Sequence, residues 1–307
     1  MLSQLFGIDL RSLALMRISL ALIGLWDLAL RSRDLSVFYT DAGAFPRLAA
    51  VGYYSDRFVA SLHMMSGATA FQAGLFLIAA AALLCMLVGY RTRLAVAVAW
   101  ILLVSLHVRT PPLLQAGDTL LRLLFFWSLF LPLGARFSVD EGLSPERPQG
   151  PARSAGTTTF MLQVCSVYLF TAMFKWHPTW LEEGSAVWYA LMLDLFATDF
   201  GRALLAYPEL LRLATWATMI WEILGALLIL IPWKRDTLRA VAVVGFVGFH
   251  MALLEPAMEL SMFPITSSVL WLPPIPPTAW AWLHRRWATP ERTGWTAYYD
   301  GDCGFCR

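Results

Sequence analysis

The chain has 307 residues, of which 58% are hydrophobic and only 14% are charged. Ordinary soluble domains are about 45–50% apolar and about 25% charged, so this composition excludes that class and indicates a polytopic membrane protein. The net charge of +2 gives no reason to expect a nucleic-acid partner, and the five histidines are too scattered to predict a metal cluster.

Apolar runs along the chain predict an all-α fold with about eight transmembrane helices, since a span needs roughly 20 mostly apolar residues. The first run lacks a small-residue cleavage site after it and is expected to remain as a span. The last run contains four prolines, which indicates a span with a broken end or a re-entrant segment. The predicted spans are residues 12–30, 68–89, 94–106, 118–135, 158–174, 213–233, 240–254 and 265–282.

The first predicted span holds Arg17 and Asp27. They are ten residues apart, so on a helix they lie roughly 80° from each other and can share a polar seam without pairing directly. Charged residues inside a membrane usually face the bundle interior and mark function. Two interpretations stay open, a functional polar site or a structural arginine and aspartate that hold the bundle together.

Short polar segments separate the next spans. The turn at residues 90–93 is tight and predicts an antiparallel hairpin of the second and third spans. The third run is short, and it either extends into His107 or is tilted less than its neighbours. Asp118 is predicted to cap the fourth helix. His107 is read as a polar residue at a helix end, with no catalytic role.

Lys175 directly follows the fifth apolar run, between Phe174 and Trp176. A lysine at such a place can extend to the lipid headgroups as an interfacial anchor. It can also sit in a partly dry pocket, where the loss of hydration favours the neutral amine and makes it a usable base.

Residues 183–211 alternate aromatic and charged positions, which predicts a helix on the membrane surface. That helix either covers a substrate pocket near Lys175 or packs peripherally.

Two further ionisable residues lie within predicted spans. Glu222 is near the middle of the sixth, where a carboxylate must be paired, protonated or facing a polar cavity. It is a candidate functional residue, with a structural partner such as Arg17 as the alternative. His250 is near the outer end of the seventh, either as a structural residue or as a hydrogen-bond partner of a quinone-like or carbonyl oxygen.

The motif Phe-Lys-x-x-x-x-Trp-x-Glu beginning at Phe174 resembles the membrane domain of vitamin K-dependent gamma-carboxylases and the related horizontally transferred transmembrane (HTTM) family. The phrases GDTLL, FLPLG and SVDEG, and the Phe-His of 249–250 followed by Met-Phe at 262–263, resemble the same families. The resemblance implies that Lys175 is a base acting on a quinone-like cofactor, with His250 beside it. Glu182-Glu183 adds one residue to the carboxylase pattern, and no large extracytoplasmic domain is present, which speaks against glutamate carboxylation itself.

The chain finishes in YDGDCGFCR, where Cys303 and Cys306 form a CxxC after a predicted strand. A CxxC at a helix start is the thioredoxin-type arrangement, because the helix N-terminus favours the thiolate of the first cysteine. The phrase resembles the DCC family of thiol-disulfide oxidoreductases, which implies a truncated thioredoxin-like α/β domain and a thiol partner. The predicted domains are therefore 1–283 in the membrane, a basic linker at 284–294 and the redox stub at 295–307.

Basic residues follow the second, fourth and sixth spans and the last one, at Arg91, Arg93, Arg136, Arg147, Arg153, Lys234, Arg235, Arg239, Arg285, Arg286 and Arg292. The positive-inside rule places that side, with both termini, in the cytoplasm of a bacterial cell, and Lys175 with His250 on the outer side. Three functions are consistent with this arrangement. The first is an enzyme acting on a lipophilic quinone-like or lipid substrate, the second a membrane anchor for a thiol-redox domain, and the third a non-enzymatic transport or immunity protein.

Overall fold

The computed structural model describes residues 5–55, 59–145 and 148–288. Within these ranges every regular element is helical, and the only β-type contacts are two isolated bridges, Ile8 with Ala152 and Ala197 with Met258. The predicted all-α fold is therefore confirmed for this part of the chain. The predicted thiol-redox segment at 295–307 lies outside the described residues.

Six helical stretches of the described chain are long and apolar enough to cross a membrane. They correspond to six of the predicted spans, and they fit an integral, multi-pass membrane protein. Helix α6 continues through His107 to Arg109, which resolves the short third run as a full helix. Four of the stretches are single helices: α2 (Leu10–Arg33), α5 (Thr69–Val88), α6 (Thr92–Arg109) and α9 (Ala155–Phe174). The fifth, Pro208–Leu230, consists of α13 (Pro208–Ile220), η3 (Trp221–Gly225) and η4 (Leu228–Leu230). The sixth, Arg235–Ala257, consists of α14 (Arg235–Gly248), η5 (Phe249–Leu254) and α15 (Glu255–Ala257).

The predicted fourth and eighth spans form shorter helices, α7 (Ala116–Ser128) and α16 (Phe263–Leu270). At 1.5 Å per residue they are roughly 20 Å and 12 Å long, less than the roughly 30 Å of a hydrocarbon core. Pro132 ends the fourth run early, because proline disfavours helical backbone in the residue before it. The prolines at 273–277 separate α16 from α17 (Pro277–Trp287), so the predicted break in the last run is present.

Short helices make up the connections. The predicted surface segment at 183–211 contains two of them and the start of α13 rather than one continuous helix. The short elements are α3 (Leu35–Phe38), α4 (Arg47–Tyr53), η1 (Leu62–Met64), η2 (Pro111–Leu113), α8 (Val139–Leu143), α10 (Pro178–Leu181), α11 (Ala186–Leu191) and α12 (Asp199–Leu204).

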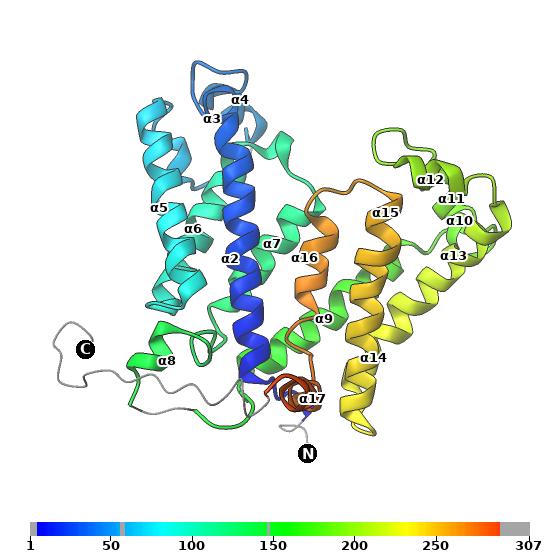
Figure 1. Cartoon of the computed structure of the whole chain (residues 1–307). Helices are drawn as coiled ribbons and strands as arrows, with labels where there is room; N and C mark the ends of the chain where they lie inside the picture. The colour runs from blue at the N-terminus through cyan, green and yellow to red at the C-terminus, as the bar shows by residue number, and fades with distance from the viewer. Residues whose placement is uncertain (1–4, 56–58, 146–147, 289–307) are drawn as a thin grey trace.

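The long helices form two groups. Figure 1 shows α2, α5 and α6 together on one side, α9, α13 and α14 on the other, and the short α7 and α16 between them. The N-terminal ends of α7 and α16 touch, since a Cβ on Gly117 would lie 2.9 Å from Met262 Cγ and 3.0 Å from Phe263 N. Glycine at 117 therefore lets the two short helices approach closely at the centre of the molecule.

Large apolar side chains also face outward from the bundle. Leu77 of α5 is 70% exposed and Val244 of α14 is 72% exposed. Soluble monomers rarely expose contiguous apolar surface of this kind, whereas a lipid-facing surface requires it. The exposed apolar side chains of the long helices thus support the same conclusion as helix length and composition, namely that these helices face lipid.

Candidate functional site

Lys175 and Glu222 form an ion pair at one end of the second helix group. The lysine is the C-cap of α9, and its Nζ lies 2.5 Å from Glu222 Oε1. The lysine side chain is 20% exposed and the glutamate 5%, so the pair has one accessible end and one buried end. Lys175 Nζ also lies 4.6 Å from the centre of the Trp180 ring, a cation–π distance.

The second oxygen of Glu222, Oε2, is buried without a hydrogen-bond partner. Its carboxylate charge is therefore balanced mainly by Lys175. In a poorly hydrated site an ammonium–carboxylate pair and the neutral amine–acid pair come close in energy, because each charge loses its hydration. Lys175 is thus both the counter-charge of the buried carboxylate and the end of the pair that solvent or a ligand can reach.

His250 belongs to a hydrogen-bonded chain beside this pair. Its Nε2 lies 2.9 Å from the hydroxyl of Tyr168, which accepts a hydrogen bond of 2.8 Å from Trp271 Nε1. The tyrosine hydroxyl keeps its own proton to donate, and His250 Nε2 is an acceptor within reach. In that tautomer the neutral histidine carries its proton on Nδ1, which is buried and has no partner. In either tautomer Nδ1 is a ring nitrogen with unused hydrogen-bonding capacity.

An aromatic cluster fixes this chain in place. The rings of Phe246 and Trp271 stack with centroids 4.1 Å apart and an interplanar angle of 7°, and Tyr168 lies 4.2 Å from Phe246. Such pairs contribute about 0.5–1.5 kcal/mol each beyond the area they bury. Helices α9, α14 and α16 are therefore joined by rigid side chains directly next to His250.

Glu222 and His250 both lie in π-helical turns, η3 and η5. A π-helical turn is a rare interruption of an α-helix that costs regular hydrogen bonding and occurs frequently at functional sites. Here the two turns bring two ionisable residues of neighbouring spans to the same side of the bundle. Both turns contact α9, because Glu222 pairs with Lys175 at the end of this helix and His250 lies within hydrogen-bond distance of Tyr168 inside it.

The segment before α12 covers the end of the seventh span. Phe196 O accepts a hydrogen bond of 2.7 Å from Glu259 N, and Thr198 Oγ1 donates one of 2.7 Å to Pro256 O. Gly201 packs against the Ala257 carbonyl with no room for a side chain. The segment from α11 to α12 is thus tied to the helix that carries His250 (Figure 1).

The structure separates Arg17 from Asp27, as the sequence predicts. Arg17 is fully buried and donates hydrogen bonds to the backbone carbonyls of Leu133, Arg136 and Phe137. Asp27 accepts hydrogen bonds of 2.8 and 2.9 Å from Arg31 Nε, one helical turn further along. Arg17 therefore binds the loop after α7, and Asp27 belongs to a different polar cluster.

One alternative is set aside and one expectation was wrong. Arg17, named as an alternative partner of Glu222, is occupied by carbonyls, and Glu222 is paired with Lys175. Asp118 is not the N-cap of α7: Gln115 is the N-cap, and Asp118 is the third helical residue of a capping box, with Oδ2 2.8 Å from Gln115 N. The reciprocal box satisfies two backbone groups, and this explains why the helix begins three residues earlier.

Sequence reasoning missed Tyr168 and Trp271, although Tyr168 lies two helical turns before Lys175 and so shares its face of α9. His107, expected at a helix end, is in the last turn of α6 but is fully buried. Cys303 and Cys306 lie outside the described residues.

The chain matches no protein-family model, no curated protein and no solved structure. The resemblance to the HTTM and carboxylase families and to the DCC family therefore stays a prediction.

Proposed function

We propose that this protein is a membrane enzyme that acts on a lipophilic quinone-like or lipid substrate, with Lys175 as its base. The observation that carries the proposal is the Lys175–Glu222 pair, in which the buried carboxylate can hold a proton while the accessible amine takes one from the substrate. The sequence resemblance to the carboxylase membrane domain adds support at the same lysine.

His250 has a matching role in this proposal. Its free Nδ1–H would donate a hydrogen bond to a substrate oxygen on which negative charge develops, while Tyr168 and Trp271 hold the ring in the required tautomer. Lys175 and His250 would thus supply the proton acceptor and the hydrogen-bond donor that deprotonation of a hydroquinone hydroxyl needs.

Ligand binding tests this arrangement directly. A short-chain naphthohydroquinone is titrated anaerobically into the detergent-purified protein, and binding is followed by quenching of tryptophan fluorescence, since Trp180 and Trp271 adjoin the site. Loss of one charged hydrogen bond costs about 1.5–3 kcal/mol, so Lys175→Ala should weaken saturable binding by roughly tenfold or more. Equal binding by the wild type and Lys175→Ala would contradict the proposal.

Lys234→Ala is a matched control, because the chain has only two lysines and Lys234 Nζ also lies 4.6 Å from a tryptophan ring, that of Trp233. This exposed lysine is on a turn at the other end of the spans, and its loss should leave binding unchanged.

We further propose that the chain crosses the membrane eight times, with α7 and α16 as two short crossings and both ends in the cytoplasm of a bacterial cell. The start of α2 and helix α17 lie at the same end of the molecule, near the turn before α14 (Figure 1). Arg93, Lys234 and Arg285 are at loops or helix ends there, in agreement with the positive-inside rule. A green fluorescent protein fused after Arg286 should fluoresce, whereas alkaline phosphatase at the same point should be inactive; the reverse pattern would contradict this topology.

A further inference from the structure

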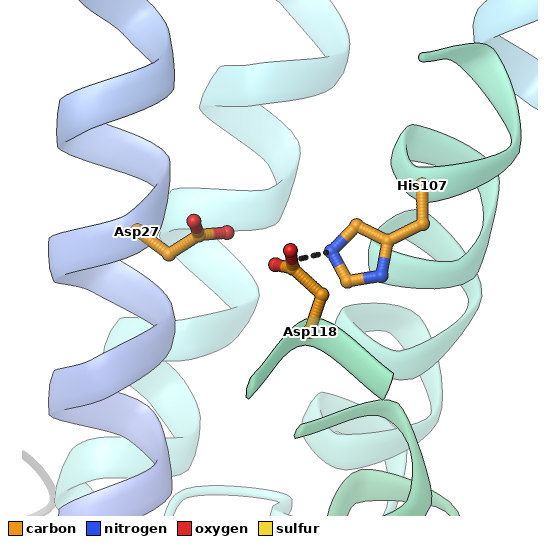
Figure 2. A group of neighbouring side chains, drawn as sticks. All are labelled: Asp27, His107 and Asp118. Atoms are coloured by element: carbon orange, nitrogen blue, oxygen red, sulfur yellow. Dashed lines mark ion pairs between the residues drawn. The ribbon is translucent and has the colours of Figure 1, made fainter. Parts of the chain in front are cut away.

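A second polar cluster lies in the first helix group, away from Lys175. Asp27 of α2, His107 of α6 and Asp118 of α7 point toward one another (Figure 2). One carboxylate oxygen of each aspartate and one ring nitrogen of His107 all lie within 4.8 Å of one another. The exposed fractions of the three residues are 4%, 0% and 0%. Three separate helices thus bring two carboxylates and one imidazole together inside the bundle.

His107 has no hydrogen-bond partner at either ring nitrogen. Nearly all buried polar groups are hydrogen-bonded, so a fully buried imidazole with two unsatisfied nitrogens requires an explanation. Its Nε2 faces Asp118 Oδ1 at 3.5 Å, the pair marked in Figure 2. The ring is therefore aimed into the cluster without being hydrogen-bonded to it.

The spacing of one pair of these atoms is that of two ligands of one metal ion. Zinc lies about 2.0–2.2 Å from imidazole nitrogen and carboxylate oxygen, so two ligands of a tetrahedral site are roughly 3.4 Å apart. The separation of 3.5 Å between His107 Nε2 and Asp118 Oδ1 is close to this value.

Neighbouring groups orient both carboxylates. Arg31 Nε donates to Asp27, and Arg31 Nη2 donates to Asp118 Oδ1 at 2.6 Å, while Gln115 N donates to Asp118 Oδ2 at 2.8 Å. Each carboxylate oxygen has two lone pairs and can accept a hydrogen bond while binding a metal. Hydrogen bonds of this kind to ligating carboxylates are usual around protein metal sites. Tyr39 Oη, 3.3 Å from Arg31 Nη1, adds a partner for the arginine.

We propose that Asp27, His107 and Asp118 bind one divalent transition-metal ion, with Arg31 as a positioning residue. Two carboxylates and one imidazole fit Zn²⁺ and similar ions better than Mg²⁺, which favours oxygen ligands throughout. Three protein ligands leave a fourth position open, as in reactive rather than structural zinc sites.

The charges of the cluster agree with this assignment. The buried groups in direct contact, two carboxylates and Arg31, carry a formal charge of −1 with a neutral histidine, and the half-buried Arg122 is a further cation near His107. An unbalanced charge is costly in a buried site. A divalent ion raises the sum to +1, and ionisation of a water bound to it, which zinc promotes near neutral pH, brings the sum to zero.

Zinc binding to the full chain is the test. The protein is purified in detergent without a histidine tag, treated with a chelator, dialysed against buffered Zn²⁺ and analysed for metal by mass spectrometry. The expected result is about one zinc per chain in the wild type and near zero in His107→Gln and Asp118→Asn. His284→Gln, which changes an exposed histidine of α17, is the control and should keep the full stoichiometry.

X-ray absorption of the wild-type zinc form provides a readout that needs no variant to fold. One imidazole and oxygen ligands for the rest are expected, whereas zero or two imidazoles would overturn the assignment. Arg31→Lys should weaken the affinity for zinc by about 10–100-fold, the usual effect of disturbing a group that orients metal ligands. Absence of saturable zinc binding by the folded wild type, or unchanged binding in His107→Gln, would overturn the metal site.

Discussion

Replacement of Lys175 by methionine should destabilise the protein strongly, because it leaves the Glu222 carboxylate buried without its counter-charge. The two charged atoms lie 2.5 Å apart, and at an effective dielectric constant of about 20 their gross attraction is roughly 6–7 kcal/mol. Desolvation offsets part of this, and removal of one partner of a buried pair typically costs about 3–5 kcal/mol.

The exposed fraction of the Lys175 side chain places the expected loss at the lower end of the range of about 3–5 kcal/mol. Because the Lys175 side chain is 20% exposed, water already weakens the pair, and we expect a loss of about 3 kcal/mol in the free energy of unfolding. At about 2–4 °C per kcal/mol, the scale of soluble proteins of 150–250 residues, this corresponds to a decrease in Tm of roughly 6–12 °C.

A double-mutant cycle isolates the pair. Glu222→Gln should cost less than Lys175→Met, because the remaining lysine keeps contact with solvent and with Trp180. In the double variant the buried charge is absent, so its loss should be smaller than the sum of the single losses by about 0.5–3 kcal/mol.

Thermal unfolding in mild detergent, followed by intrinsic fluorescence, measures all three variants, with Lys234→Met as the control that should shift stability by less than about 0.5 kcal/mol. A Lys175→Met variant as stable as Lys234→Met, or strictly additive losses, would refute the buried ion pair.

Three further predictions concern single groups. Tyr168→Phe removes the hydroxyl that joins His250 to Trp271 and should cost about 1–3 kcal/mol of unfolding free energy in the same assay, and an unchanged Tm would contradict the hydrogen-bonded chain. Burial, and secondarily the charge of Arg109, lowers the pKa of His63 to about 4. The neutral His63 side chain therefore makes its full contribution to the free energy of unfolding above the unfolded-state pKa of about 6.5. That contribution decreases as the pH falls from 6.5 toward 4. The Tm of the wild type should therefore decrease between pH 7 and 5 more than that of His63→Asn, and parallel decreases would contradict this role. Arg17→Met removes hydrogen bonds to three carbonyls and should raise amide hydrogen exchange at residues 133–141, whereas unchanged exchange there would show that the arginine does not hold this loop.

The long spans could be predicted closely from the sequence because hydropathy over 20 residues reports burial in lipid directly. Helix α5 begins and ends within one residue of the predicted 68–89, and α9 ends at Phe174 as expected. The fourth span was predicted to be longer than α7, because the length of an apolar run does not show that the helix ends before Pro132. In the last run the prolines at 273–277 did indicate the break after α16, but not how short α16 is.

Apart from the neighbourhood of Lys175 and His250 that the family resemblance implies, the candidate site was predicted as separate residues. Lys175, Glu222 and His250 each stood out as ionisable groups in apolar surroundings, but their pairing joins positions 47 residues apart and depends on how the helices pack. The π-helical turns at Glu222 and His250 leave no signal in one sequence. The Asp27–Arg31 pair could have been predicted from its spacing of four residues, whereas the approach of His107 to Asp118 could not.

The central claim, a quinone-like or lipid ligand at Lys175, is tested most directly by identifying what the protein carries from the membrane. Wild type, Lys175→Ala and Lys234→Ala are purified in parallel in mild detergent, and the extracted lipids are identified by mass spectrometry. The account predicts a quinone or a specific lipid that is enriched in the wild type and in Lys234→Ala and lost in Lys175→Ala. Bulk phospholipid alone, in equal amounts in all three, would contradict it.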